Sequence, residues 1–252
     1  FAGWPCEMQN IKKIANKYNL KVIEDCAQAH GALYRNEPVG GLGDIAAWSF
    51  CQDKIMTTGG EGGMVTCNNK NYWRRIWSYK DHGKSLDAIN RKNGKNSSNY
   101  SFKFIHDTIG TNWRLTEIQS AIGILQLNYM KKWHKKRNEN AIKIMNAARE
   151  NQLFRVPKIP EHISHAFYKL YIFVNGGLKK RNEILDKINK NGVPCYTGGC
   201  SEIYREKAFG SKKKGFLKTA EELGDTSLMF LVHPTLTKDE IKKTCEVISS
   251  IR

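Results

Sequence analysis

The first third of the chain alternates between helix-like segments and short apolar segments, and this alternation limits the folds open to it. Residues 7–18 and 71–80 carry apolar side chains at steps of three and four, the spacing of an amphipathic helix. Residues 20–25, 44–50 and 62–67 are short and apolar and end at charged residues or turns, as strands do. We therefore expect an α/β domain with a largely parallel sheet buried between helices.

The rest of the chain has a different character. Residues 110–151 predict one long helix, which Asn112 precedes and in which Glu117 is an early acid. Residues 165–174 predict a strand. Residues 181–192 and 237–251 predict two shorter helices, the first ended by a glycine and the second capped by a threonine. The positions concerned are Gly192 and Thr237.

These patterns predict two domains. The first covers residues 1–130 and includes the start of the long helix, which bridges to the second. The second covers residues 131–252 and is a smaller α+β domain, of a size that folds as a unit. Residues 84–99 are polar and predict an exposed loop.

Composition narrows the possible partners. The 252 residues carry a formal net charge of +17, which favours anionic partners such as nucleic acid, a membrane surface or phosphorylated small molecules. The basic residues are spread along the chain, so solvated charged faces are the alternative explanation. No clustered basic and aromatic pattern of a nucleic-acid binder is present, and no apolar run approaches the roughly 20 residues of a membrane span.

The seven cysteines indicate a reducing compartment. Their number is odd and no CxxC pair occurs, so we expect free thiols in a cytoplasmic protein and no metal site. The chain starts at a phenylalanine in the middle of a pattern, and we expect that upstream sequence is absent.

One lysine and one carboxylate stand where ligands bind in α/β sheets. Asp25 and Lys54 each follow a predicted strand, and glycines follow the lysine. The GxGxxG, GxxxxGK[ST] and GxSxG motifs are absent. A lysine amine can form an imine with an aldehyde cofactor, a carboxylate can keep a pyridine nitrogen protonated, and serine hydroxyls can hold a phosphate. Pyridoxal phosphate needs all three; the alternative is that Asp25 caps a turn and Lys54 is solvated.

Three segments resemble one enzyme family in the family's own order. They are "VIEDCAQAHGA" from residue 22, "GDIAAWSFCQDKIMTTGGEGGMV" from residue 43 and "GTNWRLTEIQSAIGILQL" from residue 110. Together they resemble the DegT/DnrJ/EryC1/StrS family of sugar aminotransferases, which are fold-type I pyridoxal phosphate enzymes. The resemblance implies a three-layer α/β large domain, of which residues 1–130 would be the C-terminal part, and a smaller C-terminal α+β domain.

The resemblance assigns roles to five residues. Lys54 matches the lysine that binds the cofactor covalently and then moves a proton, and Asp25 matches the acid paired with the pyridinium nitrogen. Gln28 matches a glutamine near the cofactor ring, and Ser49 matches a phosphate ligand. Asn112 matches an asparagine that reaches the phosphate in the neighbouring subunit, which implies a homodimer with shared active sites.

For other polar residues, the sequence leaves both a functional and a structural role open. Arg114 either contacts substrate or forms a salt bridge at an interface or helix start, and His30 is expected to support the site or to lie in the core. Four C-terminal residues are candidates for the sugar or the amino donor, but a structural role is the simpler explanation for each: Tyr196, Ser201, Glu202 and His233.

The resemblance also implies a reaction. A related group that removes hydroxyls has histidine where this chain has Lys54, so the lysine favours amino-group transfer. The implied donor is glutamate and the implied acceptor is a nucleotide-linked keto-sugar, in polysaccharide, lipopolysaccharide or natural-product sugar biosynthesis. The glycine loop "TTGGEGG" has one glycine more than the family's usual TGEGG. The alternative function is a truncated, inactive homologue that acts as a structural subunit.

Overall fold

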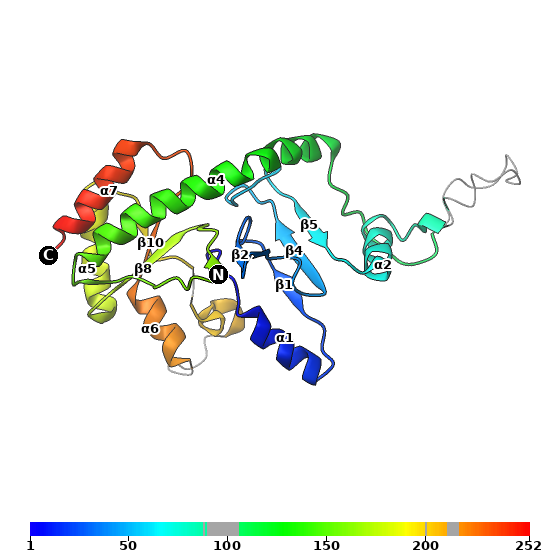
Figure 1. The fold of residues 1–252 in the computed structure, drawn as a ribbon, viewed down its shortest axis with the longest axis horizontal. Helices are drawn as coiled ribbons and strands as arrows, with labels where there is room; N and C mark the ends of the chain where they lie inside the picture. The colour runs from blue at the N-terminus through cyan, green and yellow to red at the C-terminus, as the bar shows by residue number, and fades with distance from the viewer. Residues whose placement is uncertain (88, 90–105, 200, 211–216) are drawn as a thin grey trace, which may run out of the picture. The chain divides into compact units, whose positions relative to one another are not determined.

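The computed structural model describes most of the chain as two compact units (Figure 1). We call Glu7–Ala27 and Glu37–Asn128 the N-terminal unit; Phe1–Cys6, Gln28–Asn36 and Tyr129–Arg252 form the C-terminal unit. The described residues are 1–87, 89, 106–199, 201–210 and 217–252, so most of the loop predicted at 84–99 lies outside them. Among these residues, no helix combines the length and the apolar character needed to cross a membrane.

The N-terminal unit is built on a three-stranded sheet. Its strands are β1 (Ile23–Asp25), β4 (Ile45–Ser49) and β5 (Gly63–Thr66), in the order β1-β4-β5. The helices α1 (Met8–Lys17) and α2 (Lys70–Lys80) precede and follow these strands in the chain (Figure 1).

The prediction of a largely parallel sheet is only half right for these strands. β1 and β4 run parallel, but β4 and β5 run antiparallel. The reason is the connection: residues 50–62 form a loop with no helix, and Phe50 N–H donates to the Gly62 carbonyl at 2.8 Å, closing its two ends. A parallel return would need a longer crossover segment.

A buried carboxylate holds the loop that covers one face of this sheet. Glu24 is 8% exposed, and its two oxygens accept N–H groups from Gly40, Leu42 and Gly43 at 2.9, 2.8 and 2.6 Å. Gly40 has φ +87°, and a Cβ there would lie 2.2 Å from the Trp48 ring. The loop therefore needs both the carboxylate and the glycine. The short strand β3 (Glu37–Pro38) leads into it.

We expect Glu24→Gln to destabilise the protein by about 2 kcal/mol, because one of the three N–H groups would then face an amide that cannot accept it. Chemical denaturation measures the loss. Glu37→Gln is the matched control, since it makes the same change at an exposed glutamate. Equal stability of the two variants would contradict the role given to Glu24.

The C-terminal unit contains a four-stranded antiparallel sheet and most of the long helix. Its sheet has the order β6-β8-β10-β9. The strands and helices are β6 (Phe154–Arg155), β8 (Leu170–Val174), β9 (Cys195–Tyr196), β10 (Ser227–Phe230), α5 (Gly177–Lys190), α6 (Lys218–Thr226) and α7 (Lys238–Ser250). Two short strands, β2 (Leu33–Tyr34) and β7 (Ile163–Ser164), pair antiparallel, and two single turns of 3₁₀ helix, η1 (Ile203–Arg205) and η2 (Lys207–Phe209), precede α6.

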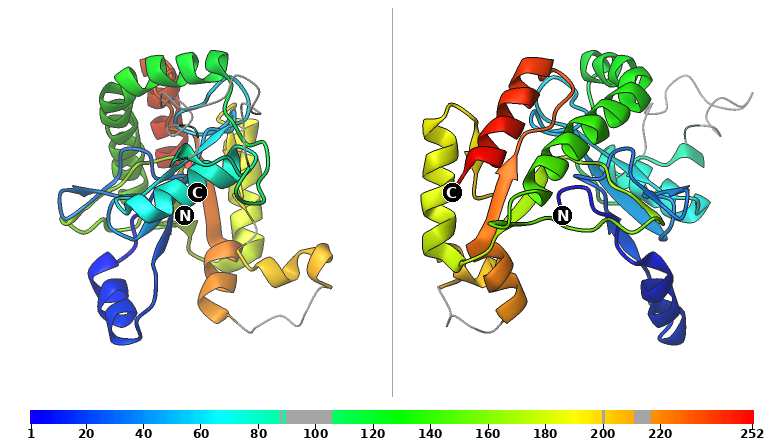
Figure 2. Two further views of the ribbon diagram at one scale, coloured as in Figure 1. Left: turned by 90° about the vertical axis from the view of Figure 1, so that its right-hand side faces the viewer. Right: turned by 60° about the vertical axis from the view of Figure 1, so that its left-hand side comes forward.

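The core of this unit lies between the sheet and three helices. Ile144 of α4, Ile172 of β8 and Ile184 of α5 have no exposed surface and belong to one apolar cluster with Ile248 of α7. In Figure 2, α5 (yellow) and α7 (red) run beside the orange strand β10. The alternation of buried and half-buried residues along β8 shows that one face of the strand points into this core.

The predicted end of α5 and the predicted cap of α7 are correct, but the predicted start of α4 is not. Thr237 caps α7 by accepting the Glu240 N–H, and Gly192, with φ +73°, follows the end of α5, as predicted. The helix α4 (Glu117–Arg149) has Glu117 in its first turn, as predicted, but it begins later than the predicted start directly after Asn112. Thr111 and Trp113 instead donate their N–H groups to carbonyls of residues 79 and 80, which holds this segment extended.

Candidate active site

Strand register brings two of the predicted site residues to one face of the sheet. Asp25 of β1 lies opposite Ala47 of β4, and Ser49 lies two residues further along β4. Residues paired in register point to the same face, as do residues two apart on one strand, so Asp25 and Ser49 share a face at the carboxyl ends of their strands. Ligands of α/β sheets bind at this edge.

Asp25 has one oxygen engaged in a turn and one left for a ligand. Its Oδ1 accepts the Ala27 N–H at 3.0 Å, and within the described residues no hydrogen bond is made to Oδ2. The side chain is exposed. Capping the turn and binding a ligand are therefore compatible roles for this carboxylate. Ser49 is arranged similarly, since its Oγ accepts the Cys51 N–H at 3.3 Å and so supports the turn that leaves β4.

The same face of the sheet is apolar and open. Ile23 is 71% exposed and Val65 is 46% exposed, and Ala47 between them is exposed too. An open apolar face with a carboxylate and a hydroxyl at one end fits a flat aromatic ring that carries a nitrogen and a phosphate.

Lys54 lies on the loop that leaves this edge. It is half-buried, and its N–H donates to the Cys51 carbonyl at 3.0 Å. The next two residues, Ile55 and Met56, are buried at 4% and 6% exposure and anchor the loop. Ser49 is thus the last residue of β4, and Lys54 lies on the loop that follows it. The neighbouring strand β1 ends at Asp25.

Gln28 lies in the C-terminal unit, unlike the other four predicted residues. Its Oε1 accepts the Ala2 N–H at 2.6 Å. A Cβ at Gly3 would lie 2.8 Å from the Gln28 carbonyl, so the backbones of the two segments approach closely. His30 of the same segment is 4% exposed, in agreement with a core position.

Asn112 is held by a small charged network. Its Oδ1 accepts the Arg114 Nε–H at 3.0 Å, and Arg114 lies 3.6 Å from the Asp81 carboxylate. Asp81 also binds Lys84 at 3.1 Å. Burial alone would raise the pKa of Asp81, but the hydrogen bond to Lys84 and the charges of Lys84 and Arg114 lower it below its ordinary value. Arg114 therefore makes the salt bridge that the sequence left as one of its two explanations.

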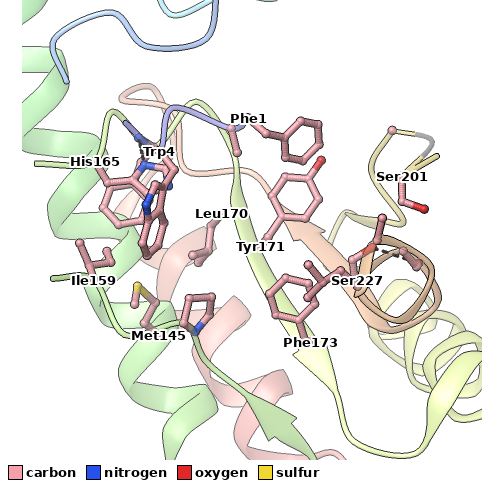
Figure 3. Close-up of a pocket in the computed structure, with 17 residues that line it drawn as sticks. Phe1, Trp4, Met145, Ile159, His165, Leu170, Tyr171, Phe173, Ser201 and Ser227 are labelled. Atoms are coloured by element: carbon pink, nitrogen blue, oxygen red, sulfur yellow. Dashed lines mark hydrogen bonds between the residues drawn. The ribbon is translucent and has the colours of Figure 1, made fainter. Parts of the chain in front are cut away.

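The C-terminal unit contains a cavity that sequence patterns did not predict. It has a volume of about 560 Å³ and apolar walls, and none of the five predicted site residues lines it. Figure 3 shows Trp4, His165 and Ile159 at one end, and Phe1, Tyr171 and Ser201 at the other. One sequence signal for the cavity was available. Side chains alternate between the two faces of β8, so Tyr171 and Phe173 lie on the face opposite its core residues.

His165 on the wall of this cavity is neutral. Burial lowers its pKa to about 3, and its Nδ1 accepts the Phe167 N–H at 2.7 Å. Its ring stacks on Phe167 with centroids 4.2 Å apart and meets Trp4 edge-on. The histidine is therefore a packing residue of the cavity wall at ordinary pH.

Of the four C-terminal candidates, Ser201 lines the cavity, whereas Glu202 and His233 have side-chain partners. Glu202 is 2% exposed and binds Arg205 at 2.9 Å and the Tyr204 hydroxyl. The His233 Nδ1 lies 2.7 Å from the Thr235 hydroxyl, and Tyr196 is 49% exposed on β9. Among the described residues, no group of three or more His, Cys, Asp or Glu side chains is placed to hold a metal ion.

Comparison with known proteins decides the family. The sequence profile of the DegT/DnrJ/EryC1/StrS aminotransferase family matches residues 1–249. The chain belongs to this family. The resemblance of the three motifs is thus confirmed over nearly the whole chain, and the DegT/DnrJ/EryC1/StrS motifs can be placed on the fold. The first ends β1, the second covers β4, the Lys54 loop and β5, and the third forms the start of α4.

Two solved structures and one curated relative that are similar to this chain support the fold. The X-ray structure of an aminotransferase from Psychrobacter cryohalolentis is 49% identical, with a TM-score of 0.91 over 98% of this chain and 66% of that one. GDP-perosamine synthase of Escherichia coli O157:H7 is 32% identical over 98% of this chain and 62% of that protein. DesV of S. venezuelae, at 23% identity, shares the fold with a TM-score of 0.84, over 99% of this chain and 62% of its own. These matches confirm the predicted fold-type I α/β class.

The chain spans less than two thirds of the length of these relatives. What the relatives' names say about substrates therefore enters only as support for a proposal about the whole protein.

Proposed function

We propose that the protein is a pyridoxal phosphate-dependent aminotransferase that moves an amino group from glutamate to a nucleotide-linked keto-sugar. The observation that carries this proposal is the common edge of β1 and β4, where a carboxylate with one open oxygen and a serine hydroxyl share a face and the lysine loop begins. Two relatives support the acceptor: the GDP-perosamine synthase named above and a dTDP-3-amino-3,6-dideoxy-alpha-D-galactopyranose transaminase of Aneurinibacillus thermoaerophilus, 27% identical over 98% of this chain and 62% of that protein.

Each residue of this edge has a distinct role in the proposal. The Oδ2 atom of Asp25 accepts a hydrogen bond from the protonated ring nitrogen and keeps that nitrogen charged. Ser49 would donate its hydroxyl to the phosphate. Gln28 is not part of this edge, and its proposed role near the ring rests on the family resemblance alone. Lys54 would hold the cofactor through its amine Nζ and would move a proton to and from the substrate carbon. When bound, the cofactor supplies a ring that withdraws electrons from that carbon.

The amine is needed in its uncharged form for both roles of Lys54. The carboxylate of Asp25 cannot replace the amine, because a carboxylate does not form an imine. The presence of lysine, carboxylate and hydroxyl together favours an active enzyme over the alternative of an inactive structural subunit.

A homodimer with shared sites is part of the proposal. In it, Asn112 donates its side-chain N–H to the phosphate in the partner's site, since its oxygen is already engaged by Arg114. Apolar side chains around this segment are strongly exposed: Ile109 is 91%, Trp113 69% and Ile118 76% exposed. A second subunit would remove this apolar surface from water.

The charge and the cysteines fit the same proposal. A net charge of +17 suits an enzyme whose substrate carries a nucleoside diphosphate and whose cofactor carries a phosphate. A cytoplasmic location is part of the proposal, because the odd number of cysteines and the lack of a CxxC pair in the sequence favour reduced thiols. Sugar biosynthesis for surface polysaccharide or lipopolysaccharide is the proposed setting.

The proposal is tested by a substrate panel. The protein, expressed from its complete reading frame and supplied with pyridoxal phosphate and glutamate, is incubated with GDP-, dTDP- and UDP-linked 3- and 4-keto-sugars. We expect one of these to yield an amino sugar together with 2-oxoglutarate, detected by mass spectrometry. Cofactor binding without an amino sugar from any acceptor or amino donor would contradict the proposal.

A further inference from the structure

The loop that carries Lys54 is held from outside by the helix α4. Gln119 Nε2 donates to the Glu61 carbonyl at 2.7 Å, and Gln126 Oε1 accepts the Thr57 N–H at 2.9 Å. The two glutamines are seven residues apart, or about two helical turns, so both project from one side of α4. All of these residues belong to the N-terminal unit.

Helix and loop also approach closely between the two hydrogen bonds. A Cβ added at Gly123 of α4 would lie 3.1 Å from Thr58 Cγ2, and one added at Gly59 would lie 3.0 Å from Ile122 Cδ1. Thr58 has no exposed surface, and its hydroxyl donates to the Glu61 carbonyl at 3.2 Å. The two glutamines and the glycine therefore act as one contact surface on α4.

The position of the two hydrogen bonds shows what they restrain. Gly59 and Gly60 have φ of +80° and +143°, and nothing lies within 4 Å of a Cβ built at Gly60. Two adjacent glycines give the loop more conformational freedom than any other residue pair would. The glutamine contacts fall at Thr57 and Glu61, one on each side of this pair.

We infer that Gln119 and Gln126 are positioning residues that hold the glycine-rich loop, and with it Lys54, in a fixed place. The inference rests on the role proposed for Lys54. It also gives a function to the third motif, which starts at residue 110 and continues into α4. This helix holds the Lys54 loop, which belongs to the second motif. Neither glutamine is assigned a contact with substrate or cofactor. Their effect passes through the backbone of residues 57–61 to the amine.

The chemistry of the two hydrogen bonds is opposite, which makes the inference sharply testable. A carbonyl oxygen only accepts, so Gln119 must present its amide nitrogen to Glu61; a backbone N–H only donates, so Gln126 must present its oxygen to Thr57. The same substitution, glutamine to glutamate, therefore removes the bond at 119 and preserves it at 126. Gln126→Met removes the second bond with little change of shape.

The experiment measures amide hydrogen exchange over residues 50–62 in the protein without cofactor. We expect exchange at Thr57–Gly62 to quicken about tenfold or more in Gln119→Glu and Gln126→Met, and to stay near the unmodified rate in Gln126→Glu. In the loaded enzyme the first two variants should lose about 10- to 100-fold in kcat with little change in the KM for the sugar, as expected when a catalytic group is displaced. Gln152→Glu, on the exposed surface of the C-terminal unit, is the matched control.

Two results would overturn the inference. One is equal exchange in the two glutamate variants, which would mean that the hydrogen bonds do not hold the loop. The other is faster exchange in Gln119→Glu and Gln126→Met with kcat unchanged, which would mean that loop order does not serve Lys54. Failure of the proposed function is recognised separately, because the unmodified protein would then lack aminotransferase activity while the exchange pattern remained measurable.

Discussion

Lys54→Ala is expected to lower kcat for amino-group transfer by about four orders of magnitude or more, because one amine has two roles in the proposed reaction. It holds the cofactor covalently, and it moves the proton at the substrate carbon. No other lysine or histidine of the described part of the N-terminal unit occupies the loop between β4 and β5. Rates of the half-reaction with glutamate, followed by the cofactor's absorbance, measure the loss.

Reduction with borohydride tests the same assignment chemically, by fixing the cofactor to the residue that holds it. In the unmodified protein we expect the cofactor to become fixed to the peptide that contains residue 54, and in Lys54→Ala we expect no labelled peptide there. Lys70→Ala serves as the control, since Lys70 is an exposed lysine at the start of α2. A Lys54→Ala protein that still forms amino sugar at a normal rate would refute the assignment.

Asp25→Asn is expected to lower kcat by about 10²- to 10³-fold while leaving the fold intact. The stabilising charge on the ring nitrogen is lost, because asparagine is neutral. The turn survives, because the asparagine oxygen can still accept the Ala27 N–H that Asp25 Oδ1 accepts at 3.0 Å. Asp25 is exposed, so the free energy of unfolding should change by no more than about 0.5 kcal/mol.

The pairing of the two measurements makes this prediction specific. Steady-state kinetics and denaturation are done on the same preparation, so loss of activity through unfolding is recognised at once. Glu24→Gln, on the opposite face of β1, should show the reverse result: lower stability with the catalytic groups in place. Unchanged turnover in Asp25→Asn would remove the carboxylate from the proposed mechanism.

Local patterns were sufficient where a structure depends on neighbours in the sequence. The Thr237 cap, the Gly192 helix end and the strands β1, β4 and β5 all follow from spacing and turn residues within a few positions. The start of α4 was wrong because Thr111 and Trp113 find backbone partners near residue 80, far away in the sequence. Helical spacing carries no information about such partners.

Motif comparison found the candidate residues but not the support around them. The spacing of Gln119 and Gln126 was visible as part of the third motif, yet nothing in the sequence connected them to the Lys54 loop. The network of Asp81, Lys84 and Arg114 around Asn112 was equally hidden, although Arg114 had a salt bridge as one of its explanations. One sequence signal was available: Gln119 and Gln126 are seven residues apart, so both polar side chains lie on one face of the predicted helix.

The sequence by itself determined the chemistry that this protein can attempt, because residue identity alone puts an amine at 54, a carboxylate at 25 and a hydroxyl at 49, and the motifs alone identify the family. Only the tertiary structure decided that Asp25 and Ser49 share one face and that α4 clamps the loop between β4 and β5. The physical reason is that strand register and helix-to-loop contacts are fixed by side chains and backbone groups many residues apart. Shifting the register of β1 by a single residue would turn Asp25 to the other face of the sheet without changing any letter of the sequence.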